Sequence, residues 1–178
     1  MNSKFRFINS NMDKLQIVEG KQNLDYRGYL RNIYNFDEFQ KSFMNKIIKQ
    51  VNYTVTNIAG SVRGLHFQVP PFAEIKLVTC IKGTIFDVAV DIRENSPTFL
   101  QYESRILSAE SNLSFLIPEG FAHGFQTLEA NCEILYLHSE EHKPHYEKKF
   151  NVKDPKIGIS WPLEITNISQ DDLSAKFI

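Results

Sequence analysis

Side chains that can move protons gather in three short stretches of this sequence. They are Arg63-Gly64-Leu65-His66-Phe67-Gln68 followed by Lys76, Ile117-Pro118-Glu119-Gly120-Phe121-Ala122-His123-Gly124-Phe125, and Glu133-Ile134-Leu135-Tyr136 with the late carboxylate Asp172. The sequence contains no G-x-S-x-G elbow, no phosphate-binding P-loop and no G-x-G-x-x-G fingerprint. These residues therefore favour acid–base chemistry over nucleophilic or nicotinamide-dependent catalysis.

Four of these residues are suited to removing a proton next to a carbonyl group. His66 can accept a proton at physiological pH, and Asp172 can orient its ring and stabilise its charged form. Lys76 can stabilise the oxygen of a developing enolate, and Tyr136 can return a proton to the opposite face of the carbon. Each also has an ordinary structural reading, as a hydrogen-bonded core residue or, for the lysine, as a solvated residue at a strand edge.

A metal-dependent reading of the same residues is weaker. The segment Pro118-x-Gly120-x-x-His123 matches the second half-motif of cupin barrels, in which the histidine often binds iron or manganese. A metal cupin also needs an H-x-H pair, and the corresponding segment here reads His66-Phe67-Gln68, with the basic Lys76 nearby. Two histidines beside an ammonium group make a poor site for a divalent cation, so we expect no metal.

Most of the chain has the pattern of β-strands. Runs of β-branched and aromatic residues are separated by Gly, Pro, Asn or Ser about every ten residues, which favours a jelly-roll sandwich or barrel. Within residues 84–93 apolar side chains share one face, and Asp87 and Asp91 lie on the other, so polar residues are expected to line a cavity. The expected strands are 76–82, 84–93, 103–108, 113–117, 121–128 and 132–138.

One helix is expected before these strands. Asn35 can cap a helix that begins at Phe36 and continues through Ser42 and Phe43, because its side chain can accept a hydrogen bond from the first turn. Apolar residues recur at helical spacing, which predicts that one face packs on the sheets. The residues on that face are Phe36, Phe39, Phe43 and Ile47.

The composition indicates a soluble globular protein with no general affinity for polyanions. The net charge is −1, so neither nucleic acid nor an anionic membrane is an expected partner. No stretch approaches the roughly 18 apolar residues of a membrane span, and the N-terminus has no signal-peptide pattern, so a cytoplasmic location is expected. The two cysteines, Cys80 and Cys132, lie in strand-like runs and are expected to be buried reduced thiols.

Taken together, the motifs resemble those of the dTDP-4-dehydrorhamnose 3,5-epimerase family, which are cupin-fold enzymes of nucleotide-linked sugars. The resemblance covers about residues 13–175, and its motifs are long and occur in the same order. Besides the three stretches above, they are Asp25-x-Arg27-Gly28, Lys76-Leu77-Val78, Phe86-Asp87-Val88-Ala89-Val90-Asp91-Ile92-Arg93, Ser96-Pro97-Thr98-Phe99, Leu107-Ser108-Ala109-Glu110 and Gly158-Ile159-Ser160-Trp161-Pro162.

The resemblance implies a homodimer of all-β, double-stranded β-helix barrels with a few short helices and no cofactor. One domain over residues 1–178 would contain N-terminal strands and a helix (13–50), a barrel core (about 51–140) and a C-terminal segment (141–178). In the family, a ligand contact that matches Arg27 crosses to the other barrel, so the stretch from Tyr26 to Tyr34 is expected to exchange strands between protomers.

The resemblance also implies a reaction and a role for each residue. The enzyme would invert C3 and C5, or C3 alone, of a nucleotide-linked 4-keto-6-deoxy sugar, with dTDP-4-dehydro-6-deoxyglucose as the default substrate. His66 matches the general base, Asp172 its partner, Tyr136 the general acid, and Lys76 the group that steadies the C4 oxygen. The residues that match nucleotide, diphosphate or sugar contacts are Arg63, His123, Arg27, Gln50, Asn52, Glu147, His142 and Gln68. The match of Gln50 and Asn52 assumes a one-residue insertion before Arg63.

Three departures from the family pattern lie at the nucleotide end. His142 stands where the family commonly stacks a tyrosine on the thymine ring, Asn32 replaces a glutamate, and Asp171 replaces a lysine. The nucleotide is therefore less firmly indicated than the reaction, and a GDP-linked sugar stays open. Two other functions also stay open, a 3,4-ketoisomerase of the same fold and a non-catalytic sugar-nucleotide-binding cupin. The family suggests bacterial surface polysaccharide, lipopolysaccharide or capsule, as the downstream polymer.

Overall fold

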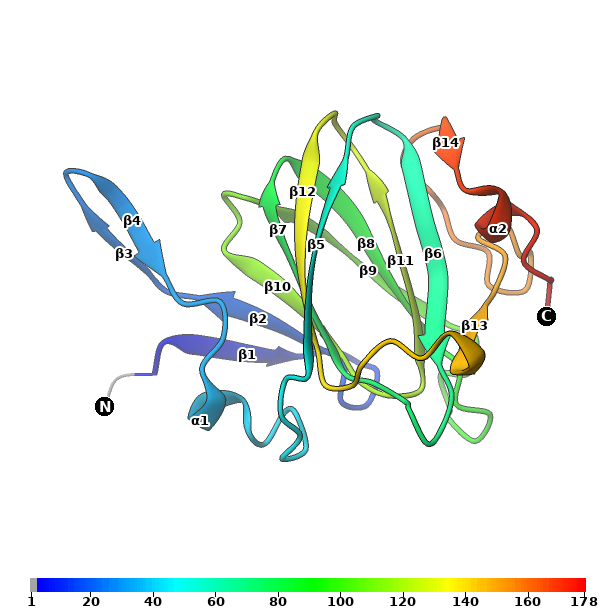
Figure 1. Cartoon of the computed structure of the whole chain (residues 1–178), viewed down its shortest axis with the longest axis horizontal. Coiled ribbons are helices and arrows are strands. Elements are labelled where there is room, and N and C mark those ends of the chain that lie inside the picture. Colours follow the sequence, from blue (N-terminus) through cyan, green and yellow to red (C-terminus); the bar gives the residue numbers. More distant parts are fainter. Residues whose placement is uncertain (1–2) are drawn as a thin grey trace.

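The computed structural model describes residues 3–178, and its regular structure is nearly all β-sheet (Figure 1). The first sheet has the strand order β1 (Phe5–Asn9), β2 (Gln16–Gly20), β10 (Leu113–Ile117), β7 (Lys76–Lys82), β12 (Cys132–His138) and β5 (Gln50–Thr56). The second has the order β13 (Glu147–Lys149), β6 (Ser61–Gln68), β11 (Phe121–Thr127), β8 (Thr84–Asp91) and β9 (Tyr102–Ser108), with β14 (Asn167–Ile168) parallel to β6. The remaining elements are the hairpin β3 (Gln22–Asp25) and β4 (Gly28–Arg31), the helices α1 (Phe36–Phe39) and α2 (Gln170–Leu173), and the 3₁₀ turn η1 (Pro144–Tyr146).

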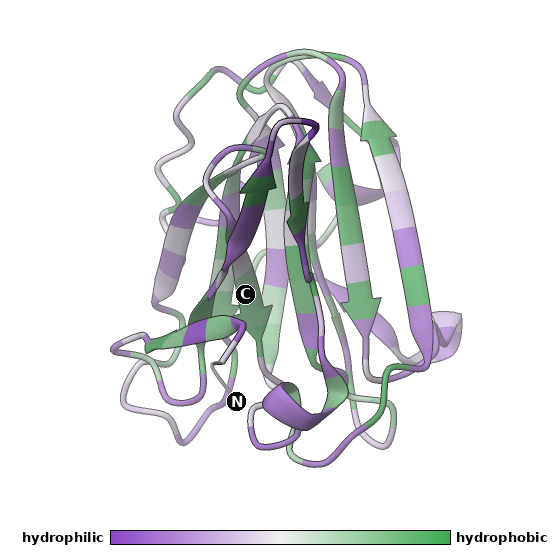
Figure 2. Ribbon diagram, turned by 90° about the vertical axis from the view of Figure 1, so that its left-hand side faces the viewer, coloured by the Kyte–Doolittle hydropathy of each residue, from purple (hydrophilic) through white to green (hydrophobic). Residues whose placement is uncertain are grey.

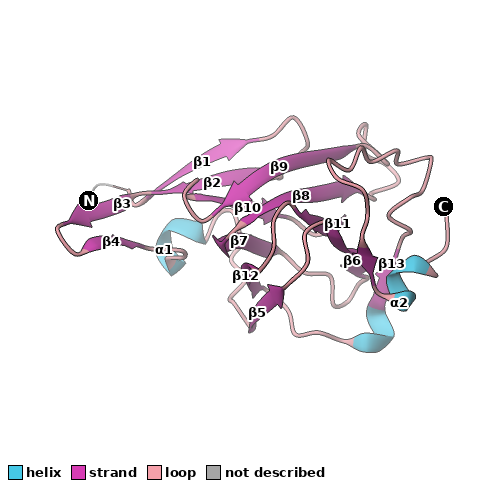
Figure 3. Ribbon diagram, turned by 90° about the horizontal axis from the view of Figure 1, so that it is seen from above, coloured by secondary structure: helices cyan, strands magenta, loops and turns pink. Residues whose placement is uncertain are grey.

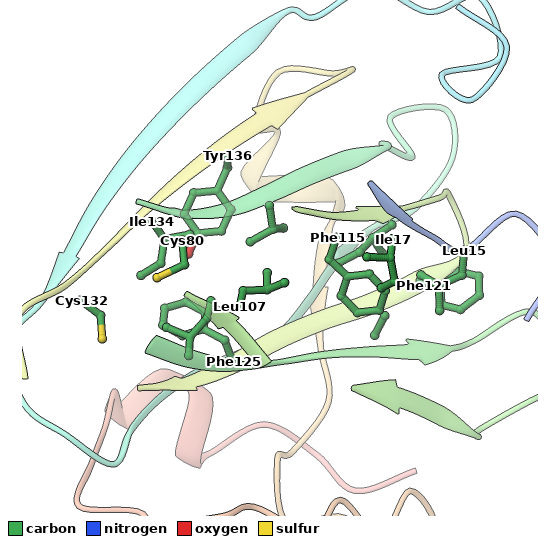
Figure 4. Packing of buried hydrophobic residues seen from close by; sticks show 14 of the residues in the cluster. Leu15, Ile17, Cys80, Leu107, Phe115, Phe121, Phe125, Cys132, Ile134 and Tyr136 are labelled. Carbon is green, nitrogen blue, oxygen red and sulfur yellow. The ribbon is translucent and has the colours of Figure 1, made fainter. Parts of the chain in front are cut away.

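The two sheets face each other across an apolar core (Figure 4). Alternate residues of the central strands enter this core, as Ile85 and Ala89 of β8 do. Val88 and Val90 point the other way and are buried in a second cluster beneath the C-terminal segment. Both faces of this strand are therefore buried. The expected all-β jelly-roll barrel with a few short helices is confirmed.

The predicted strands are all present; three have the predicted bounds, and the other three differ by one or two residues. Figure 2 shows the alternation of polar and apolar residues along them that made the prediction possible. The largest difference is at the end of β8, which stops at Asp91 instead of residue 93. Asp91 accepts hydrogen bonds from the backbone and guanidinium of Arg93 and from the hydroxyls of Ser96 and Thr98, and these bonds turn the chain out of the sheet.

The predicted helix is a single turn, so its predicted length was wrong. The cap is confirmed, because Asn35 Oδ1 accepts a hydrogen bond from the amide of Glu38 at 3.1 Å. The helix ends at Phe39, and Met44 and Asn45 soon afterwards adopt φ values of 49° and 61°, which no α-helix accommodates. As a consequence only part of the predicted apolar face is buried. Phe39 and Phe43 are buried, whereas Phe36 and Ile47 are exposed.

The hairpin of β3 and β4 projects away from the two main sheets (Figures 1 and 3). Three of its apolar side chains are exposed, and Leu24, Tyr26 and Leu30 are 76%, 97% and 64% exposed. Patches of this kind commonly mark an interaction surface.

Both cysteines are buried free thiols, as expected. Burial raises the pKa of Cys80 to about 12, which makes this thiol unreactive at neutral pH. Among residues 3–178, no helix is long and apolar enough to span a membrane.

Candidate active site

A cavity of about 560 Å³ opens between the two sheets and is lined by residues from both. His66 of β6 and His123 of β11 come from the second sheet, while Tyr136 of β12 and Lys76 of β7 come from the first. Asp172 reaches the cavity from α2, far along the chain. The four residues selected for proton chemistry therefore share one space.

His66 and Asp172 form a hydrogen-bonded pair. His66 Nε2 lies 2.7 Å from Asp172 Oδ1, and the backbone amide of Gly64 donates to Asp172 Oδ2 at 3.2 Å. The carboxylate is held in place because Ser169 caps α2 by accepting a hydrogen bond from the Asp172 amide at 3.0 Å. Burial alone would raise the pKa of Asp172, but His66, Gly64 and Lys149 outweigh it and lower that pKa to about 2. Asp172 is therefore ionised at neutral pH.

Tyr136 lines the same cavity as His66 but comes from the other sheet. Its side chain is almost completely buried and is labelled at the edge of the apolar core in Figure 4. Burial raises its pKa well above the ordinary value, so the phenol is protonated at neutral pH. The hydroxyl of Thr54 is 3.5 Å from the phenol oxygen. The cavity thus has an imidazole on one wall and a protonated phenol on the other.

Lys76 lies at the first position of β7 with its ammonium group in the cavity. Its Nζ is 3.2 Å from Glu74 Oε1 and 3.5 Å from the carbonyl oxygen of His66. The side chain is only 11% exposed, so its charge is poorly screened by water. A cation in this position can stabilise negative charge that develops on a bound oxygen.

A second buried histidine–carboxylate pair joins His123 of the cavity wall to Asp87, which does not line the cavity. His123 Nε2 is 2.8 Å from Asp87 Oδ1, and Asp87 is fully buried on the inward face of β8. Burial raises the pKa of Asp87 despite the opposing effects of His123 and Lys76. Its other oxygen has no hydrogen-bond partner among the described residues.

The predicted ligand-binding residues fall into two groups. Arg27 is exposed at the hairpin and paired with Asp25 at 2.6 Å, away from the cavity of its own chain. Gln68 is also outside the cavity, because its amide donates to the carbonyls of Phe72 and Glu141 and thereby ties two loops together. The others line the cavity, and they are Arg63, His123, Gln50, Asn52, Glu147 and His142.

Several cavity residues were not anticipated as site residues. They are Glu74, His138 and Lys149. Period-two spacing was a usable signal for two of them, because His138 is two residues after Tyr136 and Glu74 two before Lys76. Lys149 carried no such signal, since it lies opposite His66 only through the pairing of β13 with β6.

The comparison with known families decides between the readings of this site. The family model described as dTDP-4-dehydrorhamnose 3,5-epimerase matches residues 9–178. The chain belongs to this family. An epimerase of that name from Methanothermobacter thermautotrophicus is 40% identical over 177 residues, covering 98% of this chain and 95% of the relative. One from Salmonella typhimurium is 41% identical over 167 residues, covering 91% and 89%.

Solved structures of dTDP-sugar epimerases have the same fold. The dTDP-6-deoxy-D-glucose-3,5-epimerase from Legionella pneumophila, in complex with dTDP-4-keto-L-rhamnose, superposes with a TM-score of 0.92 at 36% identity, covering 97% of this chain and 92% of that one. A 3'-monoepimerase from Streptomyces bikiniensis, in complex with dTDP-quinovose, superposes with a TM-score of 0.89 at 29% identity, covering 96% and 86%. The resemblance drawn from the motifs is confirmed, and this member of the dTDP-4-dehydrorhamnose 3,5-epimerase family is an isomerase.

Proposed function

We propose that this enzyme inverts C3 and C5, or C3 alone, of a dTDP-linked 4-keto-6-deoxy sugar through an enolate. The observation that carries the proposal is the placement of His66 and Tyr136 on opposing walls of one cavity. Inversion at a carbon requires a base on one side of the sugar ring and an acid on the other. Relatives that are named epimerases favour this reaction over 3,4-ketoisomerisation.

His66 is the base of the proposed mechanism. Its Nε2 bonds to the ionised Asp172, so Nε2 carries the hydrogen and Nδ1 is left to accept a proton. The C4 ketone acidifies the neighbouring C–H bond, whose electron pair moves onto the C4 oxygen as Nδ1 takes the proton. Asp172 then stabilises the imidazolium, and Lys76 stabilises the enolate oxygen.

Tyr136 is the acid of the second step. The enolate collapses to the ketone as the ring carbon takes the phenol proton from the opposite face, which inverts the carbon without any net oxidation. The raised pKa of Tyr136 keeps the proton in place until the carbanion forms. Both residues then return to their starting states by exchanging a proton with solvent.

The diphosphate and nucleotide occupy the polar side of the cavity in this proposal. Arg63 is the cation best suited to phosphate, because its guanidinium can donate two parallel hydrogen bonds. Its Nε is oriented by Thr56 Oγ1 at 3.1 Å. His142, 49% exposed and 3.5 Å from Glu147, offers a ring for stacking on the base. A flat imidazole can stack on either thymine or guanine, so a GDP-linked sugar is the alternative substrate.

We also propose a cytoplasmic homodimer in which the hairpin of one protomer reaches the cavity of its partner. Arg27 lies on this hairpin and cannot serve its own cavity in the observed position. The exposed apolar residues Leu24, Tyr26 and Leu30 beside it would be covered by the partner. Each complete site would then contain residues of both chains.

The product of the reaction tests the proposed function. The enzyme is incubated with dTDP-4-dehydro-6-deoxyglucose, and NMR coupling constants report the configuration at C3 and C5. We expect inversion at C3, with or without C5, and a lower KM for the dTDP-linked than for the GDP-linked sugar. Recovery of unchanged substrate, or migration of the keto group to C3, would contradict the proposal.

A further inference from the structure

A carboxylate that the mechanism above does not use lies directly behind the catalytic lysine. The Glu74 side chain is only 8% exposed, and its two oxygens bind two different groups. Oε1 is 3.2 Å from Lys76 Nζ, and Oε2 is 2.7 Å from His138 Nδ1. Glu74 therefore joins the start of β7 to the end of β12.

The hydrogen bonds continue from His138 to the mouth of the cavity. Asn52 Nδ2 is 3.4 Å from His138 Nε2, and Gln50 Nε2 donates to Asn52 Oδ1 at 2.9 Å. Gln50 Oε1 in turn accepts from the backbone amide of His142 at 2.8 Å. A continuous polar chain thus connects Glu74 to the residues proposed to hold the nucleotide.

These contacts assign a hydrogen-bonding role to each nitrogen of His138. Nδ1 donates to the Glu74 carboxylate, which leaves Nε2 to accept from the Asn52 amide, as in a neutral imidazole. The His138 ring also stacks on the ring of Tyr136, with centroids 6.0 Å apart and planes at 23°. His138 therefore contacts the proposed acid and holds the carboxylate that holds the lysine.

The electrostatics explain why Lys76 needs an anion in this place. Removing an ammonium group from water costs several kcal/mol unless a counter-charge is close. The groups that face it are Glu74 from the preceding loop, Asp87 of β8, His66 of β6, His123 of β11, and Tyr136 and His138 of β12. Burial would raise the pKa of Glu74, but Lys76 and His138 outweigh it and lower that pKa, so Glu74 is ionised.

We propose that Glu74 and His138 are positioning residues of the reaction. Glu74 holds the ammonium of Lys76 on the cavity wall where the sugar's C4 oxygen binds, and His138 keeps Glu74 in place. Through Asn52 and Gln50 the same pair connects the lysine to the nucleotide end of the site. This inference rests on the proposed function, because it assigns Lys76 to the C4 oxygen.

Charge removal at Glu74 tests the proposal with little change in shape. We expect Glu74→Gln to lower kcat by about 10- to 100-fold, as small misplacements of catalytic groups do, while KM changes by less than about threefold. A purely structural ion pair would leave kcat unchanged in the folded variant, so the split between kcat and KM is the deciding readout.

Two substitutions of His138 test the second half of the proposal and replace Glu74→Gln if that variant misfolds. His138→Asn keeps an amide donor near the Glu74 carboxylate and should retain kcat within about threefold of wild type. His138→Leu keeps apolar bulk against Tyr136 but has no donor, and it should lower kcat as Glu74→Gln does. Equal kcat in the two His138 variants would overturn the role of His138.

The control is the same substitution at a similar carboxylate outside the cavity. Glu133 of β12 binds Lys82 at 3.0 Å and also the hydroxyl of Tyr53, on the other face of the same sheet. Glu133→Gln should leave both kcat and KM unchanged. Wild-type kcat in a folded Glu74→Gln, with an active parent enzyme, would overturn this inference alone, whereas an inactive parent would overturn the proposed function itself.

Discussion

Three of the four histidines that line the cavity are hydrogen-bonded to a carboxylate, but the environments of these carboxylates differ. Asp172 also accepts hydrogen bonds from the Gly64 amide and from Lys149, which lower its pKa and keep it ionised. The fully buried Asp87 instead has a raised pKa. An ionised partner stabilises an imidazolium, which is what a general base becomes. The pairs are His66–Asp172 at 2.7 Å, His123–Asp87 at 2.8 Å and His138–Glu74 at 2.7 Å.

The ionised state of Asp172 makes a prediction about stability in acid. Its pKa is lowered from 3.8 to about 2 in the folded state, so folding favours the ionised form. The resulting stabilisation is complete above about pH 5 and is lost as the pH falls through 2. Relative to Asp172→Asn, the wild type should lose up to about 2 kcal/mol of unfolding free energy between those values, measured by urea denaturation.

The control for this measurement is Ser174→Ala at the end of the same helix, because a hydroxyl group does not titrate between pH 2 and 5. Its difference in unfolding free energy from the wild type should stay constant over this pH range. A constant difference for Asp172→Asn as well would show that Asp172 is not stabilised as an anion.

At the scale of elements, the single-turn helix α1 matters through the aromatic residues around it. Phe39 packs edge-on against Phe5 and Phe7, with ring centroids 4.9 Å and 5.0 Å away. Phe39→Ala should therefore lower the unfolding free energy by about 3–5 kcal/mol. Phe36→Ala, on the same turn but 46% exposed, should lower it by less than about 1 kcal/mol. If thermal or chemical denaturation showed comparable losses of unfolding free energy for Phe39→Ala and Phe36→Ala, the observed packing would be contradicted.

The sequence predicted the barrel strands because alternation with a period of two is fixed by the pleat. It did not predict where α1 ends, since the 3.6-residue spacing of apolar residues continues to Ile47 while the backbone turns at Met44 and Asn45. The short elements β13, β14 and α2 had no detectable period, because they are ordered by pairing with β6 and by the Ser169 cap. Local pattern contains no information about such long-range contacts.

The site was predictable to a similar extent. Residues within a motif, such as His66 and Lys76, could be selected by their type and spacing. The Glu74–His138 pair could not, because its members are 64 positions apart and meet only through the register of β7 and β12. Hydrogen bonds that depend on strand register become visible only in the folded chain.

At the scale of the whole molecule, the proposed dimer predicts that two inactive variants can complement each other. Arg27→Ala would damage the partner's cavity, whereas His66→Ala would damage its own. In a co-purified heterodimer one cavity would contain both intact residues, so activity should return at subsaturating substrate. Light scattering should show a dimer at micromolar concentration. A monomer, or no gain of activity in the heterodimer, would contradict the shared site.

Exchange of substrate hydrogens with D₂O is the most direct test of the opposing base and acid. NMR of the 4-keto-6-deoxy sugar nucleotide should show no deuterium at C3 or C5 with His66→Ala, since loss of a base costs about 10²–10⁴-fold. Tyr136→Phe keeps the ring packing, so deuterium should still enter a ring carbon while inversion slows by a similar factor. Deuteration and inversion at the wild-type rate in either variant would contradict the proposed division of roles between His66 and Tyr136.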